Sequence, residues 1–312
     1  EIYNNAGWFA ALNISESTHR LILTHPGTTQ STPVVQLCQN VLQLTLDSPD
    51  GRVALAQAMV EPIKNALTYQ SPVRKFLMID ELSCGMQPEY ICEGLGVPIY
   101  YASDHTIKPY VHRQKEEDWD WSNFKVTKCF DKKNAKENTF IIDRLQVKLK
   151  EEIQKLEERA LIQLLDAAIT SEEQVIHTYA ETLKRAILDS MGTLDSMNLM
   201  AAKILCHPKT YRKMCSVLGF GFIDAASAKN VLMTGTYAHI ESADVHVSVL
   251  APENELYITP PSNYLGIMAL PPEYLNVNLC EKGGDALDLT ANQQCMLILL
   301  NPDCVKKVKI RW

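Results

Sequence analysis

At 312 residues, with 46% hydrophobic and 21% charged residues, the chain is long enough to bury a large core in one elaborated domain or in two. Its formal net charge of −7 excludes broad coating of nucleic acid, because phosphate binding needs clustered Lys and Arg. No apolar run approaches the ~18 residues needed to cross a bilayer, and the first residues lack the basic and apolar regions of a signal peptide.

Residues 1–49 are rich in Thr, Ser, Gln and Asn, with scattered apolar residues and no clear period. Such a segment is too polar to form a core alone and too apolar for a free linker, so we expect an extended arm that lies on another surface. A helix is predicted to begin at Asp50, to kink at Pro62 and to end at Ser71. Apolar residues at helical spacing indicate it, namely Val53, Ala56, Val60, Ile63 and Leu67.

Residues 73–82, VRKFLMIDEL, predict a strand. From Ser83 to Val126 the chain is irregular apart from the β-like IYYASD, and a loop this long is typical of a functional segment or an extended hairpin. Its stretch HRQKEEDWDW clusters the carboxylates of Glu116, Glu117, Asp118 and Asp120 with two indoles. A solvated loop tip explains the carboxylates better than a cation site does. The indoles of Trp119 and Trp121 would be costly to leave in water, so they indicate a partner surface.

The segment from Gln146 to Ile169 is the most strongly helical of the chain and contains no Gly or Pro. We expect the helix that contains it to begin between Thr139 and Gln146. Its apolar positions recur about every 3.6 residues, which disfavours a coiled coil with its repeat of about 3.5. They are Leu149, Ile153, Leu156, Ala160, Leu164 and Ala167. The half KLKEEIQKLEER is expected to carry a solvated charged face, and the half ALIQLLDAAI to be buried.

The segment that follows begins with Thr170-Ser171-Glu172-Glu173, which fits a capping box and predicts a helix through Ile187. A strand is expected at 201–206 and a helix from Pro208 to Gly219. The alternation at 245–249, the turn APENE and the run 256–259 predict a hairpin. Residues 293–300 and 305–310 flank an Asn-Pro turn, and the lysines of the second run predict an edge strand. The predicted fold class is α+β without βαβ alternation.

No motif of a nucleotide-binding loop, serine hydrolase or metalloprotease is present, and GFGFID at 219–224 has only two glycines of a dinucleotide fingerprint. Glu173 and His177, four residues apart on a predicted helix, could share a metal, but a simple surface pair is favoured because no third ligand is placed. Nine cysteines occur without any C-x-x-C spacing, so we expect reduced, buried thiols and folding in a reducing cytoplasm. We predict no catalytic site, no metal and no cofactor.

The order of these elements resembles the major capsid protein of tailed bacteriophages with the Hong Kong 97-type fold. In that family an arm leads into an extended loop, a spine helix crosses a peripheral domain, an axial domain is inserted, and strands close the chain. The stretches that carry the resemblance are VRKFLMIDELSCGMQPEY, QVKLKEEIQKLEERALIQLLDAA, AKILCHPKTYRKMCSVLG, VHVSVLAPENELYIT and CMLILLNPDCVKKVKI.

The resemblance implies a domain map: N-terminal arm 1–50, helix and strand of the peripheral domain 51–82, extended loop 83–127, peripheral domain with spine helix 128–170, axial domain and return strands 171–289, and closing peripheral strands 290–312. It implies a structural protein, not an enzyme, that forms pentamers and hexamers of an icosahedral shell around double-stranded DNA. The implied location is the virion, after assembly in the host cytoplasm. Implied partners are copies of itself, with portal, scaffold, prohead protease and decoration proteins, DNA without specific binding, and no membrane. We assign the assembly interface to the aromatic residues Trp8, Phe9, Tyr100, Tyr101, Tyr110, Trp119 and Trp121.

Three alternatives stay open beside this interpretation. Encapsulins, the shells of bacterial nanocompartments, share the fold but usually begin with a helix where this chain has a long arm, so the phage protein is preferred. An intracellular enzyme of an unrecognised α+β fold would need a pocket with convergent polar groups, and no motif supplies one. A coiled-coil interaction protein is disfavoured by the period of the apolar stripe.

Overall fold

The computed structural model describes residues 2–3, 9–15, 18–24, 45–82, 99–103, 106–110, 121–138, 140–196, 199, 203–218, 236–240 and 243–312. The chain divides into two units. The first comprises residues 1–61, 127–149 and 277–291, and the second comprises residues 62–126, 150–276 and 292–312.

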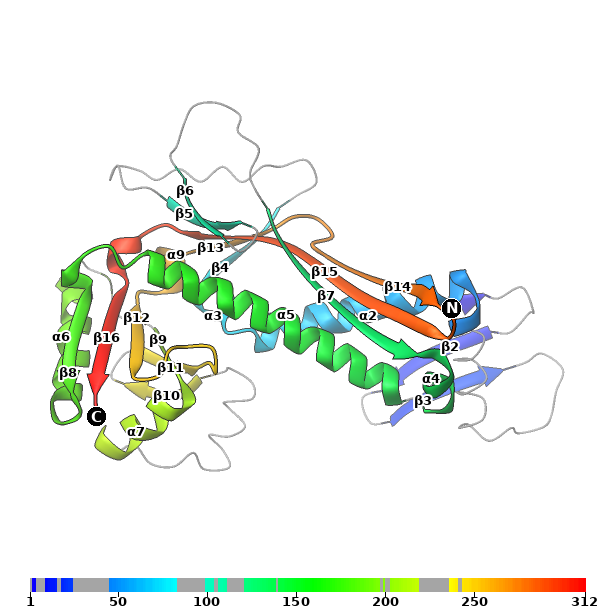
Figure 1. Ribbon diagram of the computed structural model, residues 1–312, viewed down its shortest axis with the longest axis horizontal. Coiled ribbons are helices and arrows are strands. Elements are labelled where there is room, and N and C mark those ends of the chain that lie inside the picture. Colours follow the sequence, from blue (N-terminus) through cyan, green and yellow to red (C-terminus); the bar gives the residue numbers. More distant parts are fainter. Residues whose placement is uncertain are drawn as a thin grey trace. The chain divides into compact units, whose positions relative to one another are not determined.

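Two long helices dominate the helical part of the chain, α2 (Pro49–Gln70) and α5 (Phe140–Ala167) (Figure 1). Shorter helices among the described residues include α3 (Val73–Phe76), α4 (Lys132–Glu137), α6 (Leu183–Ser196), α7 (Pro208–Leu218) and α9 (Ser262–Leu265). The apolar stripe predicted for α5 is confirmed at Leu149, Ile153, Ala160 and Leu164, which are buried, whereas Leu156 and Ala167 are only half-buried. Pro62 lies in the interior of α2, as expected. Among the described residues, no helix combines the length and the apolar character that a membrane span requires.

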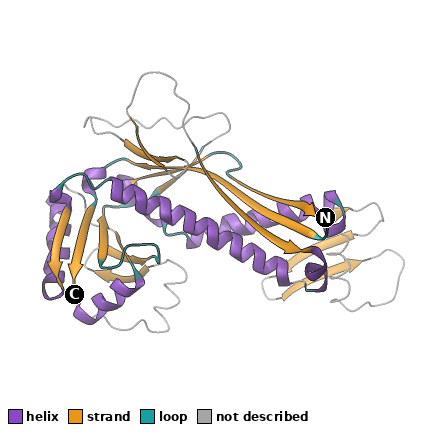
Figure 2. Cartoon of the chain, viewed as in Figure 1, coloured by secondary structure: helices purple, strands orange, loops and turns teal. Residues whose placement is uncertain are grey.

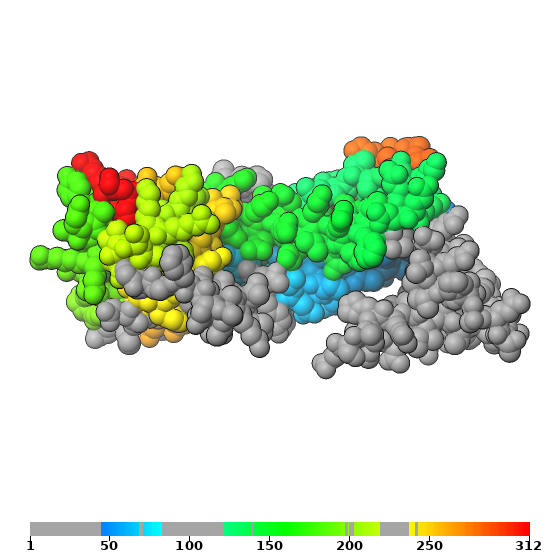
Figure 3. Space-filling view, turned by 90° about the horizontal axis from the view of Figure 1, so that it is seen from below, coloured from blue at the N-terminus to red at the C-terminus, as the bar shows by residue number. Residues whose placement is uncertain are grey.

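A six-stranded sheet forms the core of the second unit together with α6 and α7 (Figure 2). Its strands, in spatial order, are β10 (Thr236–Ile240), β11 (Ala243–Val247), β9 (Lys203–Cys206), β12 (Glu255–Thr259), β16 (Lys306–Arg311) and β8 (Val175–Tyr179). The pairs β9–β11 and β8–β16 are parallel. Ile187 of α6 and Met214 of α7 bury against Val308 and other residues of this sheet, because both helices have one apolar face. The end of β16 reaches the surface beside the segment of β8 and α6 (Figure 3).

A seven-stranded sheet is organised around β15 (Ala286–Leu299). Along one path the order is β4 (Met78–Glu81), β13 (Gly266–Leu270), β15, β5 (Ile99–Ser103) and β6 (Thr106–Tyr110), while β7 (Ser122–Asp131) and β14 (Leu275–Gly283) also pair with β15. A separate antiparallel sheet contains β1 (Ile2–Tyr3), β2 (Phe9–Ser15) and β3 (Thr18–Thr24). The boundary between the two units falls inside α2, α5, β7, β14 and β15, so each of these elements contributes residues to both units.

Two local predictions before α5 are wrong. The run 73–82 is not one strand, because Val73–Phe76 forms the short helix α3, in which Lys75 and Phe76 donate backbone hydrogen bonds to Pro72. Only Met78–Glu81 is a strand. The loop expected to reach 127 ends earlier, since β7 begins at Ser122 and alternates buried and exposed residues, the pattern of a half-buried strand.

The helix predicted from Thr170 to Ile187 is replaced by a 3₁₀ turn, the strand β8, a second 3₁₀ turn at Ala180–Thr182 and the helix α6. The capping box exists, but Gln174 closes it with Ser171, and it caps a 3₁₀ turn at Glu172–Gln174. The strand β8 follows, and α6 begins only at Leu183. Val175, Ile176 and Tyr179 fit a strand as well as a helix, and pairing with β16 decides between them.

The pairing in the six-stranded sheet corrects two further predictions. The runs 245–249 and 256–259 do not form a hairpin, because β9 lies between β11 and β12. The last strand is not an edge strand, because β16 lies between β12 and β8. The parallel neighbours β9 and β11 are separated in sequence by α7 and β10, so this pair does not introduce the βαβ alternation that the α+β prediction excluded.

The expectation for the cysteines is met only in part. Among the described residues Cys206, Cys295 and Cys304 are buried, whereas Cys129 and Cys280 are exposed, and all are free thiols. Burial raises the pKa of the Cys206 thiol to about 12, which keeps it protonated and unreactive at neutral pH.

Two glycines offer a matched test of the packing. A Cβ on Gly266 would collide with the carbonyl oxygen of Ile298 on the paired strand β15, whereas a Cβ on Gly192 in α6 would meet nothing within 4 Å. We expect Gly266→Ala to lower the free energy of unfolding by at least ~2 kcal/mol. Gly192→Ala should raise it by about 0.5–1 kcal/mol, because alanine favours a helix over glycine. Urea denaturation measures both, and equal effects of the two variants would contradict the assigned pairing.

Candidate functional site

The residues predicted to form an assembly interface lie in different parts of the chain. Trp8 and Trp119 are outside the described residues. Phe9 lies in β2, Tyr100 and Tyr101 in β5, and Tyr110 in β6, where it pairs with Ile99. Trp121 is half-buried and packs against Ala269, Met296 and Ile298. The role of these residues in assembly stays a prediction.

The metal site and the cation site considered from the sequence gain no support from the described residues. Glu173 lies in the 3₁₀ turn and His177 in β8, so the two do not share a helix face as the prediction assumed. Across the part of the chain that the structure describes, no group of three or more His, Cys, Asp or Glu side chains could hold a metal ion. The carboxylates at 116–118 and 120 lie outside the described residues.

The strongest polar feature of the second unit is the buried carboxylate of Glu157 on α5. Its side chain is 0% exposed, and that of its partner Arg74 is 1% exposed. Arg74 Nη2 donates to Oε1 at 3.0 Å, and Gln293 Nε2 of β15 donates to the same oxygen at 2.5 Å. Ser71 Oγ donates to Oε2 at 2.5 Å. One carboxylate therefore connects the segment after α2, the helix α5 and the strand β15.

Arg74 remains charged despite its burial. Burial by itself would lower the pKa of Arg74, but the charge of Glu157 and the contacts with Tyr274 outweigh it and raise the pKa. Arg74 Nη1 lies 3.5 Å from the Tyr274 hydroxyl, and the guanidinium carbon lies 5.4 Å from the centre of the Tyr274 ring. The pair is thus a charged, desolvated ion pair, in which removal of either partner would strand the other charge.

Glu158, the next residue of α5, makes a second polar joint. Its Oε2 accepts a hydrogen bond from Ser248 Oγ at 2.5 Å and its Oε1 accepts one from Gln154 at 3.0 Å. Burial raises the pKa of Glu158, although both hydrogen bonds oppose that shift. Ser248 directly follows β11 and donates its backbone N–H to Cys206 of β9. Glu158 therefore ties α5 to the end of the six-stranded sheet.

The end of α5 carries a third joint, centred on Asp166. Its Oδ1 accepts hydrogen bonds from the Tyr257 hydroxyl at 2.7 Å and from Lys307 Nζ at 2.8 Å. Lys307 also lies 2.7 Å from a carboxylate oxygen of Glu255 and 5.1 Å from the centre of the Tyr257 ring. Burial, followed by the bond to Asp166, raises the pKa of Tyr257, so the hydroxyl stays a donor. This network explains why β16 carries lysines without being an edge strand.

The amide of Gln174 satisfies the backbone where the chain leaves α5. Its Nε2 lies within hydrogen-bond distance of the carbonyl oxygens of Ala168 at 2.9 Å, Pro302 at 3.0 Å and Val305 at 3.2 Å. Its Oε1 accepts the backbone N–H of Thr170 at 3.0 Å. The side chain that closes the capping box in the structure thus also joins the end of α5 to the segment before β16.

The expectation for the charged half of α5 is therefore wrong at Glu157 and Glu158. The surface pair that does form on this half joins Lys155 to Glu152 at 3.2 Å. A signal for the buried carboxylate was present, because Glu157 falls four residues after Ile153 and four before Leu161, in line with buried positions. Such a position predicts a carboxylate that needs a partner in the core.

Replacement of Glu157 tests the first joint. Glu157→Gln keeps the shape but leaves the charge of Arg74 unpaired, so we expect a loss of about 3–5 kcal/mol in the free energy of unfolding. The matched control is Glu152→Gln, which removes an exposed ion pair with Lys155 and should cost less than ~1 kcal/mol. Denaturant titration of both variants measures the difference, and a small effect at 157 would refute the assignment.

Lys203 provides a test through pH. Burial lowers the pKa of Lys203 to about 8, and its Nζ lies 5.8 Å from the centre of the Phe76 ring. Between pH 8 and the ordinary value of 10.5 the unfolded chain therefore binds more protons than the folded one. The contribution of Lys203 to the free energy of unfolding should therefore rise with pH between 8 and 10.5. We expect the stability of the wild type to increase relative to that of Lys203→Met between pH 8 and 10.5, and a constant difference would contradict the shift.

Comparison with known proteins identifies the fold. No protein-family model and no curated protein matches the sequence. The structure is similar to the virus-like particle of Pyrococcus furiosus, with a TM-score of 0.50 and 10% identity over 81% of this chain and 98% of that chain. It is also similar to the putative capsid protein of a prophage of E. coli CFT073, with a TM-score of 0.52 and 11% identity over 83% of this chain and 99% of that chain. The chain therefore has the α+β Hong Kong 97-type capsid fold that the order of its elements predicted.

Proposed function

We propose that this chain is the shell-forming subunit of a tailed phage head, and that its copies form the pentamers and hexamers of an icosahedral shell around double-stranded DNA. The observation that carries the proposal is the extent of the structural likeness. The fold accounts for 98% of one particle-forming chain and 99% of a putative capsid protein. The similarity extends over nearly the whole of both compared chains and is not limited to one shared domain. It therefore supports a shell subunit more strongly than an enzyme that contains only part of the fold.

The polar chemistry of the described residues supports a structural role. The buried carboxylates Glu157 and Glu158 and the partly exposed carboxylate of Asp166 all bind groups of the same chain, and each joins α5 to another element. Catalytic carboxylates are more often directed into a cleft, where substrate can reach them. We therefore favour a protein without enzymatic activity over an enzyme of an unrecognised α+β fold.

The N-terminal region favours a phage subunit over an encapsulin. Before residue 45 the described elements are the strands β1, β2 and β3, which pair in one antiparallel sheet. Encapsulins usually begin with a helix at the corresponding place.

We assign the six-stranded sheet with α6 and α7 to the axial domain of the implied map, and include β16 in it because β16 pairs with β12 and β8.

The net charge supports DNA as contents and not as a bound ligand. A subunit with a charge of −7 repels phosphate on average, so packaged DNA stays mobile inside the shell. Portal, scaffold, prohead protease and decoration proteins belong to the proposal as partners of such a head. The proposed location is the virion, with assembly in the host cytoplasm.

Electron microscopy and size-exclusion chromatography of the expressed full-length chain test the proposal. We expect closed shells, or rings of five and six copies, because the fold builds particles from many copies of one chain. Monodisperse monomers over a broad range of concentration and salt would overturn the proposal. Particles isolated from cells that express the chain naturally then separate the two shell types, since nuclease-protected double-stranded DNA inside supports the phage head and a protein cargo supports the nanocompartment.

A further inference from the structure

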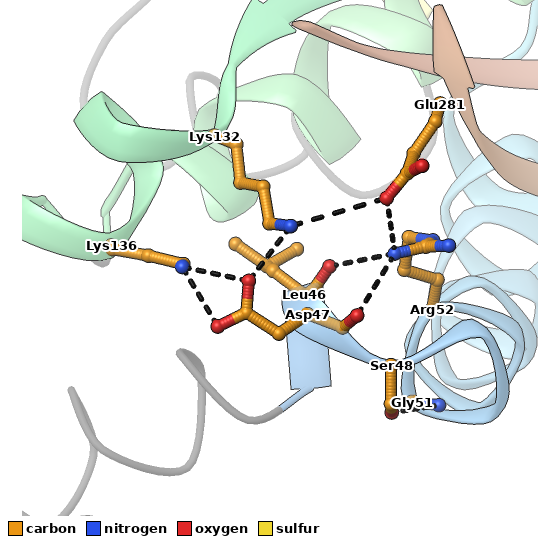
Figure 4. A network of polar contacts seen from close by, with 8 residues as sticks. All are labelled: Leu46, Asp47, Ser48, Gly51, Arg52, Lys132, Lys136 and Glu281. Carbon is orange, nitrogen blue, oxygen red and sulfur yellow. Dashed lines mark hydrogen bonds and ion pairs between the residues drawn. The ribbon is translucent and has the colours of Figure 1, made fainter. Parts of the chain in front are cut away.

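The turn that precedes α2 is held by several polar contacts (Figure 4). Leu46 is 0% exposed. Ser48 Oγ accepts the backbone N–H of Gly51 at 2.9 Å, and the carbonyl oxygen of Ser48 accepts the backbone N–H of Arg52 at 3.1 Å. These contacts close the turn at the start of α2, where free N–H groups otherwise need partners.

Arg52, which lies at the start of α2, also stabilises the turn that precedes this helix. Its Nη1 donates to the carbonyl oxygen of Leu46 at 3.0 Å and lies 3.4 Å from that of Asp47. It also lies 2.9 Å from a carboxylate oxygen of Glu281 on β14 (Figure 4). A single guanidinium thus satisfies backbone carbonyls that the preceding helical turn leaves free, and it connects the turn to β14.

Gly51 is required for this arrangement. A Cβ at this position would lie 2.5 Å from the carbonyl oxygen of Thr45 and 2.7 Å from its Cα. Both are backbone atoms, so no side-chain rotation could relieve the contact. Leu46, Gly51 and Arg52 therefore form a fixed part of the turn, held by burial and by backbone hydrogen bonds.

Asp47 makes a different kind of connection, to α4. Its carboxylate lies 2.7 Å from Lys132 Nζ and 2.8 Å from Lys136 Nζ (Figure 4), and its side chain is 44% exposed. The hydrogen bonds from Lys132 and Lys136 lower the pKa of Asp47, so it is ionised at neutral pH. Helix α4 is itself anchored, because Asp131 accepts the N–H of Asn134 as its N-cap. Exposed pairs of this kind add little to folding stability and weaken as salt rises.

We infer that Thr45–Arg52 is the root of the N-terminal segment, and that Asp47 is a positioning residue that latches this root to α4. The buried and backbone contacts hold the turn together, and the latch adds to them by holding the turn against α4. The effect on particles rests on the proposed function, in which that preceding segment contacts a neighbouring copy. The latch itself is a property of the single chain.

The test compares three full-length variants with the wild type. Asp47→Asn removes the charge of the latch, and Asp47→Glu keeps it. Asp189→Asn is the matched control, since it neutralises another exposed carboxylate, 3.7 Å from Arg185 in the second unit. Hydrogen exchange read by mass spectrometry reports on the amides of Gly51 and Arg52, and electron microscopy reports on particles.

We expect Asp47→Asn to speed exchange at these amides about three- to tenfold, with the unfolding midpoint shifted by less than about 3 °C. Asp47→Glu and Asp189→Asn should leave exchange unchanged. Salt near 0.5 M should speed exchange in the wild type but not in Asp47→Asn, because it screens the same interaction. Particle yield should fall at least fivefold in Asp47→Asn alone.

Unchanged exchange in Asp47→Asn would overturn the latch. Faster exchange with particles of normal yield and size would overturn its positioning role. If the wild type forms no particles under any condition, the proposed function fails, and the exchange measurements still decide whether Asp47 latches the root.

Discussion

The carboxylate of Glu157 has no access to water. The position of α5 in the second unit depends on the groups that neutralise this charge and donate hydrogen bonds to it. Arg74 supplies the opposite charge, while Ser71 and Gln293 supply further hydrogen bonds. A buried carboxylate without such partners would cost several kcal/mol, so α5 can rotate or slide only if all of these contacts break together. Apolar packing alone tolerates small shifts of a helix, whereas a buried, hydrogen-bonded ion pair does not. The pair therefore fixes the register of α5 against the segment after α2 and against β15.

The other joints extend this control along the same helix. Glu158 reaches the end of β11 through Ser248, and Asp166 reaches β12 and β16 through Tyr257 and Lys307. Successive polar residues of one helix thus hold both the six-stranded sheet and β15. In the proposed role as a shell subunit, the chain would have to keep its internal geometry while neighbouring copies press on its surfaces, and directional contacts of this kind suit that demand. The first unit differs, because its ion pairs at Asp47 are exposed and therefore contribute less than the buried pair of Arg74 and Glu157.

Prediction from sequence succeeded where local signals agree with the fold. The period of the stripe in α5, the helix signals of α2 and the Pro208 start of α7 are local, and the order of elements was enough to predict the Hong Kong 97-type fold. It failed where distant pairing decides. The five residues of β8 fit a helix face until β16 is placed beside them, and no local signal inserts β9 between β11 and β12. The charge of Glu157 was read as solvent-exposed because its partner Arg74 lies 83 residues away in sequence.

The measurement that tests this account most directly is a double-mutant cycle on the central ion pair. The free energy of unfolding is determined for the wild type, Arg74→Met, Glu157→Met and the double variant. Each single variant leaves one buried charge without its partner, and the double variant leaves none. The account predicts that the double variant is more stable than the sum of the single effects implies, with a coupling of at least ~2 kcal/mol. Additivity within about 0.5 kcal/mol would show that the two charges do not depend on each other, and would contradict the claim that this pair positions α5.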